Sequence, residues 1–390
     1  LPFDHPLYIM YSSGTTGLPK SIVHSAGGTL VQHLKEHRLH CDLRRGDTIL
    51  YFTTCGWMMW NWLVSSLAVG ATVVLYDGSP VYPDAGALWR MAEQLGITVF
   101  GTSARYLAAL EAAGEQPGKQ HDLRRLRSIL STGSTLSEES FDYVYREVKA
   151  DLLLGSITGG TDIVSCFALA NPTLPVKRGQ LQCRGLGMKV EAYDPTGQPV
   201  VGAQGELVCT RAFPSMPIYF WDDPDNAKYR QAYFEDYPGV WRHGDYISIY
   251  PDGGVKVFGR SDATLNPGGV RIGTAEIYRV VESLPEVDDA LAVGQQQDGE
   301  DRVILFVKLS GNGQLGPELE ATIRESLRTR CSPRHVPDLI MAVPDIPYTI
   351  NGKKVELAVK QLLTGQEAPN RDALANPEAL DHFRELGLET

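Results

Sequence analysis

The chain has 390 residues, of which 43% are hydrophobic and 21% charged, a composition typical of a globular protein with more than one core. Its formal net charge of −11 disfavours a nucleic-acid partner or an anionic membrane, because no overall positive field attracts either. No stretch reads as a membrane span or a signal peptide, so we predict a cytoplasmic protein without a membrane partner.

The first part of the chain alternates strands with helices. After an extended apolar run at Leu7 to Met10, we expect a helix from about residue 25 to 41. Four strands and two helices then alternate, the strands at Thr48–Phe52, Ala71–Tyr76, Ile97–Phe100 and Arg127–Leu130 and the helices at Ala85–Leu95 and Leu136–Lys149. Gly96 would end the first of these helices, and Thr135 or Ser137 would cap the second. This alternation predicts a layered, largely parallel α/β sheet.

The sequence pattern changes after about residue 171. Turn signals at Asp194-Pro195-Thr196-Gly197 and Asp252-Gly253-Gly254 predict antiparallel hairpins in a β-rich subdomain, residues 172–261. From Asp262 we expect an α+β module of helix, strand, strand, helix and strand, at Thr274–Leu284, Ala290–Val293, Val303–Leu309, Pro317–Arg330 and Leu339–Val343. A polar connector and a short terminal helix would follow. The predicted domains are 1–261 and 262–390.

Neither the histidines nor the cysteines predict a structural metal site. His33, His37 and His40 recur at helical spacing near one face, where two could share a metal. No acidic ligand or H-E-x-x-H pattern accompanies them, so we expect solvated or partly packed side chains instead. The six cysteines form no C-x-x-C pair and are interpreted as reduced, mostly buried thiols.

A loop rich in glycine and hydroxyl groups is the most informative local feature. The stretch from Tyr11 to Lys20 holds two glycines and four serine or threonine residues. Glycine lets backbone N–H groups face an anion, while hydroxyls and lysine add hydrogen bonds and charge. Pro19 stands where the Walker pattern needs glycine, which disfavours a kinase or GTPase. The loop suits a polyphosphate, with an ordinary polar turn as the alternative; the candidate ligands are Ser12, Ser13, Gly14, Thr15, Thr16, Gly17 and Lys20.

This loop and five later stretches, in the same order, resemble the adenylate-forming enzymes, which include acyl-CoA synthetases, peptide-synthetase adenylation domains and luciferases. Each stretch alone also suits a turn, a cap, a hairpin end or a solvated lysine, so the shared order makes the resemblance specific. It covers the chain up to about residue 360. The five stretches are 131–135 (STGST), 155–162 (GSITGGTD), 241–245 (WRHGD), 259–262 (GRSD) and 347–353 (PYTINGK).

The resemblance implies an α/β fold with a large N-terminal domain and a small, mobile C-terminal α+β domain. That large domain would combine the layered sheet with the β-rich subdomain. Enzymes of the family have a long region before the loop, so we expect the upstream part of the large domain to be missing from this sequence. Asp262 would be the hinge.

The resemblance also implies which residues bind ATP. Thr161 would touch the α-phosphate, Asp162 would hold Mg²⁺, and Lys353 would be the adenylation lysine, which makes these three the candidate catalytic residues. Asp162 is one carbon shorter than the usual glutamate. Thr158 replaces an aromatic residue, so adenine stacking must come from elsewhere. Adenine and ribose would contact Gly133, Ser134, Thr135, Ser156, Ile157, Thr158, Asp245 and Arg260.

The chemistry implied is attack of a carboxylate on the α-phosphorus of ATP, followed by transfer of the acyl group to the thiol of coenzyme A, which acts as co-substrate. Gly269 would leave room for the pantetheine arm, and Arg271 and Arg328 would contact CoA phosphates. The glycines near residue 269 suit an ordinary turn equally well. An adenylation domain that serves a carrier protein and a non-catalytic nucleotide-binding fragment are the competing predictions.

The acid itself would occupy a pocket formed by Trp57, Met58, Met59, Thr132 and Gly159. The tryptophans and methionines of residues 57–62 also suit a hydrophobic core. Acetate-activating relatives have tryptophan at the position of Gly159, so glycine predicts a longer acid. By the same resemblance, residues 21–30, 56–67 and the extension past Lys353 favour acetoacetate, with propionate or another short acid as the alternative. The sequence predicts no oligomeric state.

Overall fold

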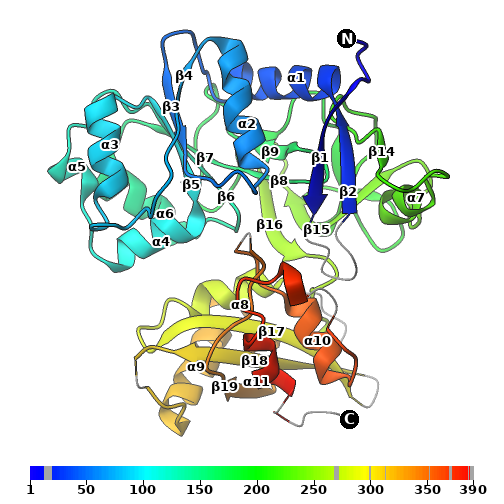
Figure 1. The fold of residues 1–390 in the computed structure, drawn as a ribbon. Coiled ribbons are helices and arrows are strands. Elements are labelled where there is room, and N and C mark those ends of the chain that lie inside the picture. The colour runs from blue at the N-terminus through cyan, green and yellow to red at the C-terminus, as the bar shows by residue number, and fades with distance from the viewer. Residues whose placement is uncertain are drawn as a thin grey trace. The chain divides into compact units, whose positions relative to one another are not determined.

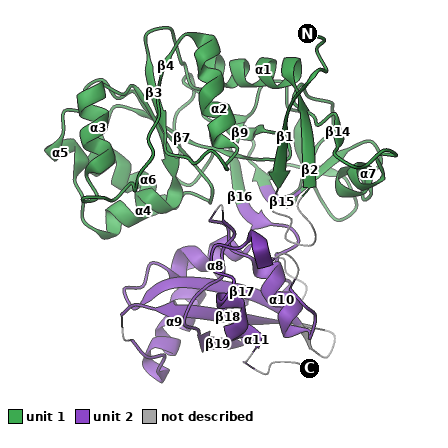
Figure 2. Cartoon of the chain, viewed as in Figure 1, with its two compact units in different colours: residues 1–12, 20–243, 248–257 green, residues 13–19, 244–247, 258–390 purple. Residues whose placement is uncertain are grey.

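A computed structural model of the chain describes residues 1–12, 20–267, 272–297, 300–311, 313–350, 352–368, 371–384 and 386. The chain divides into two compact units (Figures 1 and 2). Unit 1 comprises residues 1–12, 20–243 and 248–257, and unit 2 comprises residues 13–19, 244–247 and 258–390. The predicted domain limits at residues 261 and 262 stay a prediction.

A parallel five-stranded sheet lies at the centre of unit 1, as the alternation of strands and helices predicts. Its strand order reverses between β3 and β5, because the chain first adds β4 on one side of β3 and then adds the remaining strands on the other. Across the sheet, the strands are β4 (Thr72–Val74), β3 (Thr48–Tyr51), β5 (Val99–Ser103), β6 (Ser128–Thr132) and β7 (Leu153–Ser156).

Helices cover both faces of this sheet, with α3, α4 and α6 on one face and α2 on the other (Figure 1). Successive side chains of a strand point to opposite faces, so Leu50 lies in the first core and its neighbours Ile49 and Tyr51 lie in the second. The bounds of the helical segments in this layer are α2 (Met59–Ser65), η2 (Ser66–Val69), α3 (Ala87–Leu95), α4 (Ala104–Ala112), α5 (Pro117–Gln120), α6 (Glu138–Tyr143) and η3 (Val144–Val148). Gly96 ends α3 and Ser137 caps α6, as predicted.

Smaller antiparallel sheets accompany the parallel one, and the strands from β10 to β16 confirm the β-rich region expected after residue 171. The predicted turns at Asp194 and Asp252 join β11 to β12 and β15 to β16. One sheet has the order β1 (Pro6–Ser12), β2 (Lys20–Ser25), β14 (Tyr219–Phe220), and a second has β10 (Cys183–Arg184), β9 (Ser165–Leu169), β8 (Thr158–Gly160). The third has β12 (Pro199–Val200), β11 (Val190–Tyr193), β13 (Gln204–Cys209), β15 (Trp241–Ile249) and β16 (Val255–Arg260), and α7 spans Ala227–Phe234.

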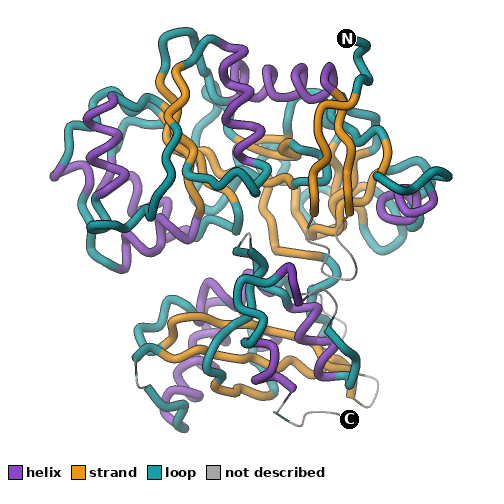
Figure 3. The backbone as a smooth tube through the Cα atoms, viewed as in Figure 1, coloured by secondary structure: helices purple, strands orange, loops and turns teal. Residues whose placement is uncertain are grey.

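Unit 2 contains a three-stranded sheet with helices on both faces (Figure 3). Its strands are β17 (Val287–Gln297), β18 (Glu300–Leu309) and β19 (Leu339–Ala342). One face packs against α8 (Thr274–Val281) and α9 (Pro317–Arg330), and the other against α10 (Glu356–Leu363) and α11 (Ala379–Arg384). Short 3₁₀ turns occur at Pro333–His335 and Arg371–Ala373. The predicted α+β module is confirmed, with α10 as an addition.

The predicted N-terminal helix is present as α1 (Ala26–Lys35), which continues into a π-helical turn, η1 (Glu36–His40), and Ser25 is its N-cap. The expectation of solvated or partly packed histidines on this helix is wrong. His33, His37 and His40 are at most 1% exposed. His37 Nε2 lies 3.0 Å from the carbonyl oxygen of Trp62, so the polar face of the helix meets polar groups of another layer rather than water.

The burial of His37 predicts a pH-dependent stability. Burial, followed by the neighbouring His33, lowers the pKa of His37 to about 3, whereas an unfolded histidine titrates near 6.5. Below pH 6.5 the unfolded chain therefore binds the extra proton, and stability falls as the pH falls. Between pH 7 and pH 5 this loss amounts to about 2 kcal/mol for His37, at about 1.36 kcal/mol for each pH unit.

Denaturant unfolding of His37→Gln across this range should show a smaller loss of stability on acidification than the wild type. Measurements at pH 8 provide the internal control, because any change there reflects packing and not titration. If the variant lost as much free energy of unfolding between pH 7 and pH 5 as the wild type, the loss could not be assigned to His37.

Among the described residues, the structure has no helix that is both long and apolar enough to cross a membrane.

Candidate active site

The ends of the parallel strands place several of the predicted site residues at one edge of the central sheet. Trp57 and Met58 follow β3, Gly133 follows β6, and Ile157 follows β7. In open α/β sheets, ligands bind outside the carboxyl ends of the strands, where the strand order reverses. Here that point lies between β3 and β5, so this edge of unit 1 is the candidate binding edge.

Hydrogen bonds connect the two predicted adenine-binding stretches. Ile157 N donates to the carbonyl oxygen of Ser131 at 2.8 Å, and Thr132 Oγ1 donates to the carbonyl oxygen of Ile157 at 2.9 Å. Gly133 has a left-handed backbone, with φ +93°, and a Cβ atom there would lie 3.7 Å from the Trp57 indole. The structure therefore brings the turn after β6, the segment after β7 and the Trp57 ring together. Ser134 and Thr135 are exposed, Thr158 is half-buried and Ser156 is buried.

The two methionines of the predicted acyl pocket pack into the core of unit 1. Met58 and Met59 are 6% and 2% exposed and lie among core residues of the sheet and α2. Trp57 is only partly buried against the same core. The core interpretation therefore holds for both methionines, and their part in a pocket wall stays a prediction.

Gly159 has a backbone reason to be glycine. A Cβ atom at this position would lie 2.0 Å from the Ser165 carbonyl oxygen and 2.7 Å from the Cys166 Cα. These are backbone atoms of β9, the strand paired with β8, so no side-chain movement relieves the clash. The prediction that Gly159 opens the acyl pocket stays untested, and close pairing of the two strands is a second reason for glycine.

The neighbouring Gly160 offers a matched comparison, because a Cβ atom there would come no closer than 3.4 Å, to the His243 ring. We expect Gly159→Ala to lower the free energy of unfolding by about 1–3 kcal/mol, the usual cost of overpacking a tight site. Gly160→Ala should cost less than about 1 kcal/mol. Denaturant unfolding of both variants checks this, and equal losses would contradict the backbone explanation.

Asp162 is a charged residue of the candidate site in unit 1 that contacts both Lys20 and Tyr233. Its Oδ1 atom accepts from the ammonium of Lys20 and from the hydroxyl of Tyr233. Lys20 Nζ also lies 3.3 Å from the Tyr233 hydroxyl and 4.7 Å from the centroid of its ring. Burial opposes ionisation of Asp162, but the neighbouring Lys20, followed by His243, outweighs it and holds the pKa of Asp162 well below its usual range. Asp162 is therefore a carboxylate at neutral pH.

Tyr233 is a residue of this site that sequence reasoning missed. It lies on α7, outside every motif, and its ring stacks on Trp241 with centroids 3.6 Å apart. Phe220 and Tyr229 pack edge-on against the same ring. The aromatic repeat of residues 229, 233 and 234 was the available signal, but it indicates packing and not a contact with residue 162.

The residues around Asp162 fit a bound Mg²⁺ ion. Mg²⁺ in nucleotide enzymes is typically held by one or two carboxylates together with substrate phosphates and water. Asp162 supplies one charged carboxylate, with 16% of its side chain exposed. The described residues include no group of three or more histidine, cysteine or acidic side chains arranged to hold a metal by themselves. One charged carboxylate matches the share that a protein contributes to a Mg²⁺ ion bound together with nucleotide phosphates.

Thr161 is held through its backbone, because His24 Nε2 lies 3.3 Å from its carbonyl oxygen. The hairpin of β1 and β2 places Ser12 opposite Lys20, so the first and last of the predicted phosphate ligands face each other. The predicted loop ligands Ser13, Gly14, Thr15, Thr16 and Gly17 lie outside the described residues.

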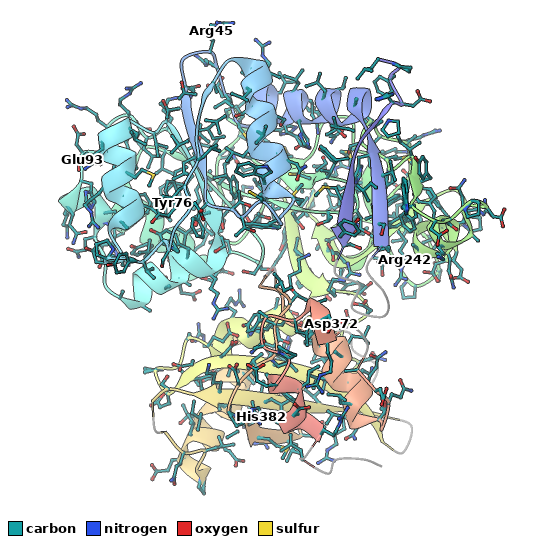
Figure 4. All side chains as sticks on the ribbon, in the orientation of Figure 1. Arg45, Tyr76, Glu93, Arg242, Asp372 and His382 are labelled. Atoms are coloured by element: carbon teal, nitrogen blue, oxygen red, sulfur yellow. The ribbon has the colours of Figure 1, made fainter. Side chains whose placement is uncertain are left out.

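Arg242 lies in the same motif as His243, but it forms ion pairs with residues other than Asp162. The position of Arg242 is labelled in Figure 4. Its guanidinium pairs with Asp236 at 2.7 Å and with Glu206 at 3.3 Å. This pairing gives Arg242 a structural role in unit 1.

Unit 2 gathers the predicted ribose-binding and hinge residues. Arg260 Nη1 lies 3.1 Å from Asp245 Oδ1, and Arg260 Nε lies 3.5 Å from Asp262 Oδ1. Gly244 has φ +84°, and a Cβ atom there would lie 2.6 Å from the Arg260 guanidinium. The glycine therefore permits the close approach of arginine to Asp245, whose side chain is 13% exposed. The role of Asp262 as a hinge stays a prediction.

Lys353 follows a tight turn in unit 2, and it is exposed. Its backbone N–H donates to Thr349 Oγ1 at 3.1 Å, and its carbonyl oxygen accepts from Thr349 N at 2.8 Å. Arg328, a predicted CoA contact, is exposed on α9 and pairs with Glu325 at 3.2 Å. The other two CoA candidates, Gly269 and Arg271, lie outside the described residues.

Comparison with protein-family models matches residues 2–220 to the AMP-binding enzymes and residues 276–353 to the AMP-binding enzyme C-terminal domain. The chain belongs to the AMP-binding enzyme family. Its resemblance to adenylate-forming enzymes is thereby confirmed.

Among curated proteins, the chain is 59% identical to acetoacetyl-coenzyme A synthetase of Rhizobium meliloti over 389 residues and 56% identical to acetoacetyl-CoA synthetase of Gallus gallus over 388 residues. These matches cover 100% and 99% of this chain but 60% and 58% of the relatives. The chain therefore spans about three fifths of the length of the relatives it matches.

Two solved structures confirm the α/β fold of adenylate-forming enzymes. The structure of an acetoacetyl-CoA synthetase from Streptomyces lividans matches with a TM-score of 0.94 and 48% identity, over 99% of this chain and 60% of that one. An anthranilate CoA ligase in complex with anthranoyl-AMP matches with a TM-score of 0.77 over 92% of this chain and 67% of that one. At 21% identity, the second similarity is evidence for the fold alone.

Proposed function

We propose that this chain is the catalytic part of an ATP-dependent acid–thiol ligase that activates acetoacetate and transfers it to coenzyme A. The identity of 53–59% to acetoacetyl-CoA synthetases from a bacterium and several vertebrates carries this proposal. The products would be acetoacetyl-CoA, AMP and pyrophosphate. The partners are small molecules, and a cytoplasmic location is part of the proposal.

In the proposed first step, the acetoacetate carboxylate attacks the α-phosphorus of ATP and pyrophosphate leaves. Negative charge then accumulates on a few oxygen atoms, so positioning and charge stabilisation dominate the catalysis. Lys20 would neutralise phosphate charge, Thr161 would contact the α-phosphate and Lys353 would stabilise the charge that develops during transfer. A Mg²⁺ ion held by Asp162 would supply further neutralisation of the phosphates.

Nucleotide recognition is assigned to the edge of the central sheet and to the aspartate of unit 2. Gly133, Ser134 and Thr135 would line the adenine site together with residues 156–158. Asp245 would accept hydrogen bonds from the ribose hydroxyls, and its neighbour Arg260 would contact the nucleotide.

In the proposed second step, the thiol of coenzyme A attacks the acyl carbon and AMP leaves. Gly269, Arg271 and Arg328 are the proposed contacts for coenzyme A, and Asp262 is the proposed hinge of the change between the two steps. Trp57, Met58, Met59, Thr132 and Gly159 are the proposed walls of the acyl pocket.

ATP–pyrophosphate exchange with the purified protein tests the proposal. Acetoacetate should give the highest exchange rate when compared with acetate, propionate and butyrate, and free coenzyme A should then yield the thioester. One methylene group contributes only about 1–3 kcal/mol of discrimination, so a second short acid can show exchange at a lower rate. Propionate ranking first would favour the alternative acid. Exchange without thioester formation would favour a carrier-protein substrate, and no exchange with any acid would favour a non-catalytic fragment.

A further inference from the structure

An ion cluster lies one residue beyond Lys353, with its lysine and aspartate largely buried and its glutamate, Glu282, exposed. The ammonium of Lys354 contacts the carboxylates of Glu282 and Asp289, the latter at 2.7 Å, and donates to the carbonyl oxygen of Ala290. Only 14% of the Lys354 side chain and 10% of the Asp289 side chain are exposed. The ammonium also lies 4.1 Å from the centroid of the Tyr278 ring, a favourable position for a cation.

The same cluster holds the other end of the turn that contains Lys353. Tyr348 donates its hydroxyl hydrogen to Asp289 Oδ2 at 2.7 Å, and Tyr348 pairs with Lys354 as an antiparallel bridge. One carboxylate of β17 therefore holds the residues on both sides of the turn from Thr349 to Lys353. Within the turn, two hydrogen bonds join Thr349 to Lys353, at 2.8 and 3.1 Å.

The charges of the cluster support a fixed ion pair. Burial disfavours the charged form of Lys354, but Glu282 and Asp289 outweigh it and raise the pKa of the ammonium above its usual value. Burial likewise opposes ionisation of Asp289, but Lys354 outweighs it and lowers the pKa of that carboxyl. Lys354 therefore stays charged and in place, and its own ammonium is not available to a nucleotide.

We propose that Lys354 is a positioning residue for Lys353: its ion pairs with Asp289 and Glu282 fix the turn from which Lys353 extends, so that adenylation depends on both lysines. The inference rests on the proposed adenylation role of Lys353. The competing explanation is that the cluster only stabilises unit 2, in which case its loss would affect every activity of the protein equally.

The test uses Lys354→Met in the purified protein and measures both half-reactions. Pyrophosphate exchange should fall by about 10- to 100-fold, because a displacement of about 1 Å in a catalytic group costs up to about 10²-fold in rate. Thioester formation from supplied acyl-adenylate should stay within about twofold of the wild type. Lys354→Arg, which keeps the positive charge, should recover part of the lost exchange.

Lys308→Met is the matched control. Lys308 also pairs with an aspartate of unit 2, Asp345, at 2.8 Å, but both side chains are 37% exposed. This pair is linked to Tyr348 indirectly, through Asn376, which donates to Asp345 and accepts from the Tyr348 amide. This variant should leave both half-reactions unchanged. Wild-type exchange in Lys354→Met, or an equal loss in both half-reactions, would overturn the inference while leaving the proposed function intact.

Hydrogen exchange provides a readout that needs no activity. Protection of the Thr349 and Lys353 amides should fall in Lys354→Met and not in Lys308→Met. If the wild type itself shows no pyrophosphate exchange, the proposed function fails, and unchanged amide protection in Lys354→Met would separately overturn the positioning of the turn. Should Lys354→Met fail to fold, Asp289→Asn tests the same link, because it removes the charge with little change of shape.

Discussion

Replacement of Lys353 by alanine should lower ATP–pyrophosphate exchange by about 10²–10³-fold, the usual cost of one charge-stabilising contact in a transition state. A lysine ammonium about 3 Å from a developing anion contributes roughly 5 kcal/mol at an effective dielectric constant of about 20. Lys353 is exposed at the end of its turn, so truncation removes the cation without opening a cavity. Thioester formation from supplied acyl-adenylate should continue near the wild-type rate, because the proposed role of Lys353 ends with the first step.

Lys360→Ala is a suitable control for this experiment. Lys360 lies on α10 of the same unit, and its loss changes the net charge by the same amount. Exchange should be unaffected in this variant. Wild-type exchange in Lys353→Ala would remove Lys353 from the proposed reaction, and a parallel loss of thioester formation would indicate a general structural effect.

The elements that sequence patterns predicted best are those with explicit end signals. Helix α9 has the predicted bounds, Pro317 to Arg330, because proline favours the first turn of a helix and acidic residues follow it there. Helix α3 ends at Gly96, which adopts φ +59°. Helix α10 is absent from the predicted elements, although its buried residues Ala358, Val359, Leu362 and Leu363 follow helical spacing.

The candidate site could be predicted only where its residues are consecutive in sequence. The stretch that ends in Asp162 was recognisable as a motif, but its contacts with Lys20 and Tyr233 join residues 142 and 71 positions away. No local pattern encodes such a pairing. The predicted exposure of His33 and His37 was wrong for a related reason, since the pattern of the helix alone does not indicate that a second layer covers its polar face. The contacts of Lys354 with Glu282 and Asp289 could not be predicted either, because two adjacent lysines look equivalent in sequence.

Replacement of Asp162 by asparagine should also lower pyrophosphate exchange by about 10²–10³-fold and raise the Mg²⁺ concentration needed for half-maximal rate. Asparagine keeps the shape of the side chain and can still accept from Tyr233, but it removes the negative charge proposed to hold the metal. It also leaves the Lys20 ammonium beside a neutral group, in a site where that ammonium now contacts Asp162. The loss of the metal-binding charge and the loss of the Lys20 partner would both weaken binding of the ATP phosphates in the proposed reaction.

Two further variants separate the charge of Asp162 from its geometry. Asp162→Glu keeps the carboxylate and has the residue usual in the family, so exchange should stay within about tenfold of the wild type. Tyr233→Phe removes one hydrogen bond to a charged group, for which a typical contribution of about 1.5 kcal/mol predicts a loss of about tenfold. Denaturant unfolding of each variant identifies any loss of fold. If Asp162→Asn matched the wild type in both exchange rate and Mg²⁺ dependence, Asp162 would not be the metal-binding carboxylate, and its pairing with Lys20 would be structural.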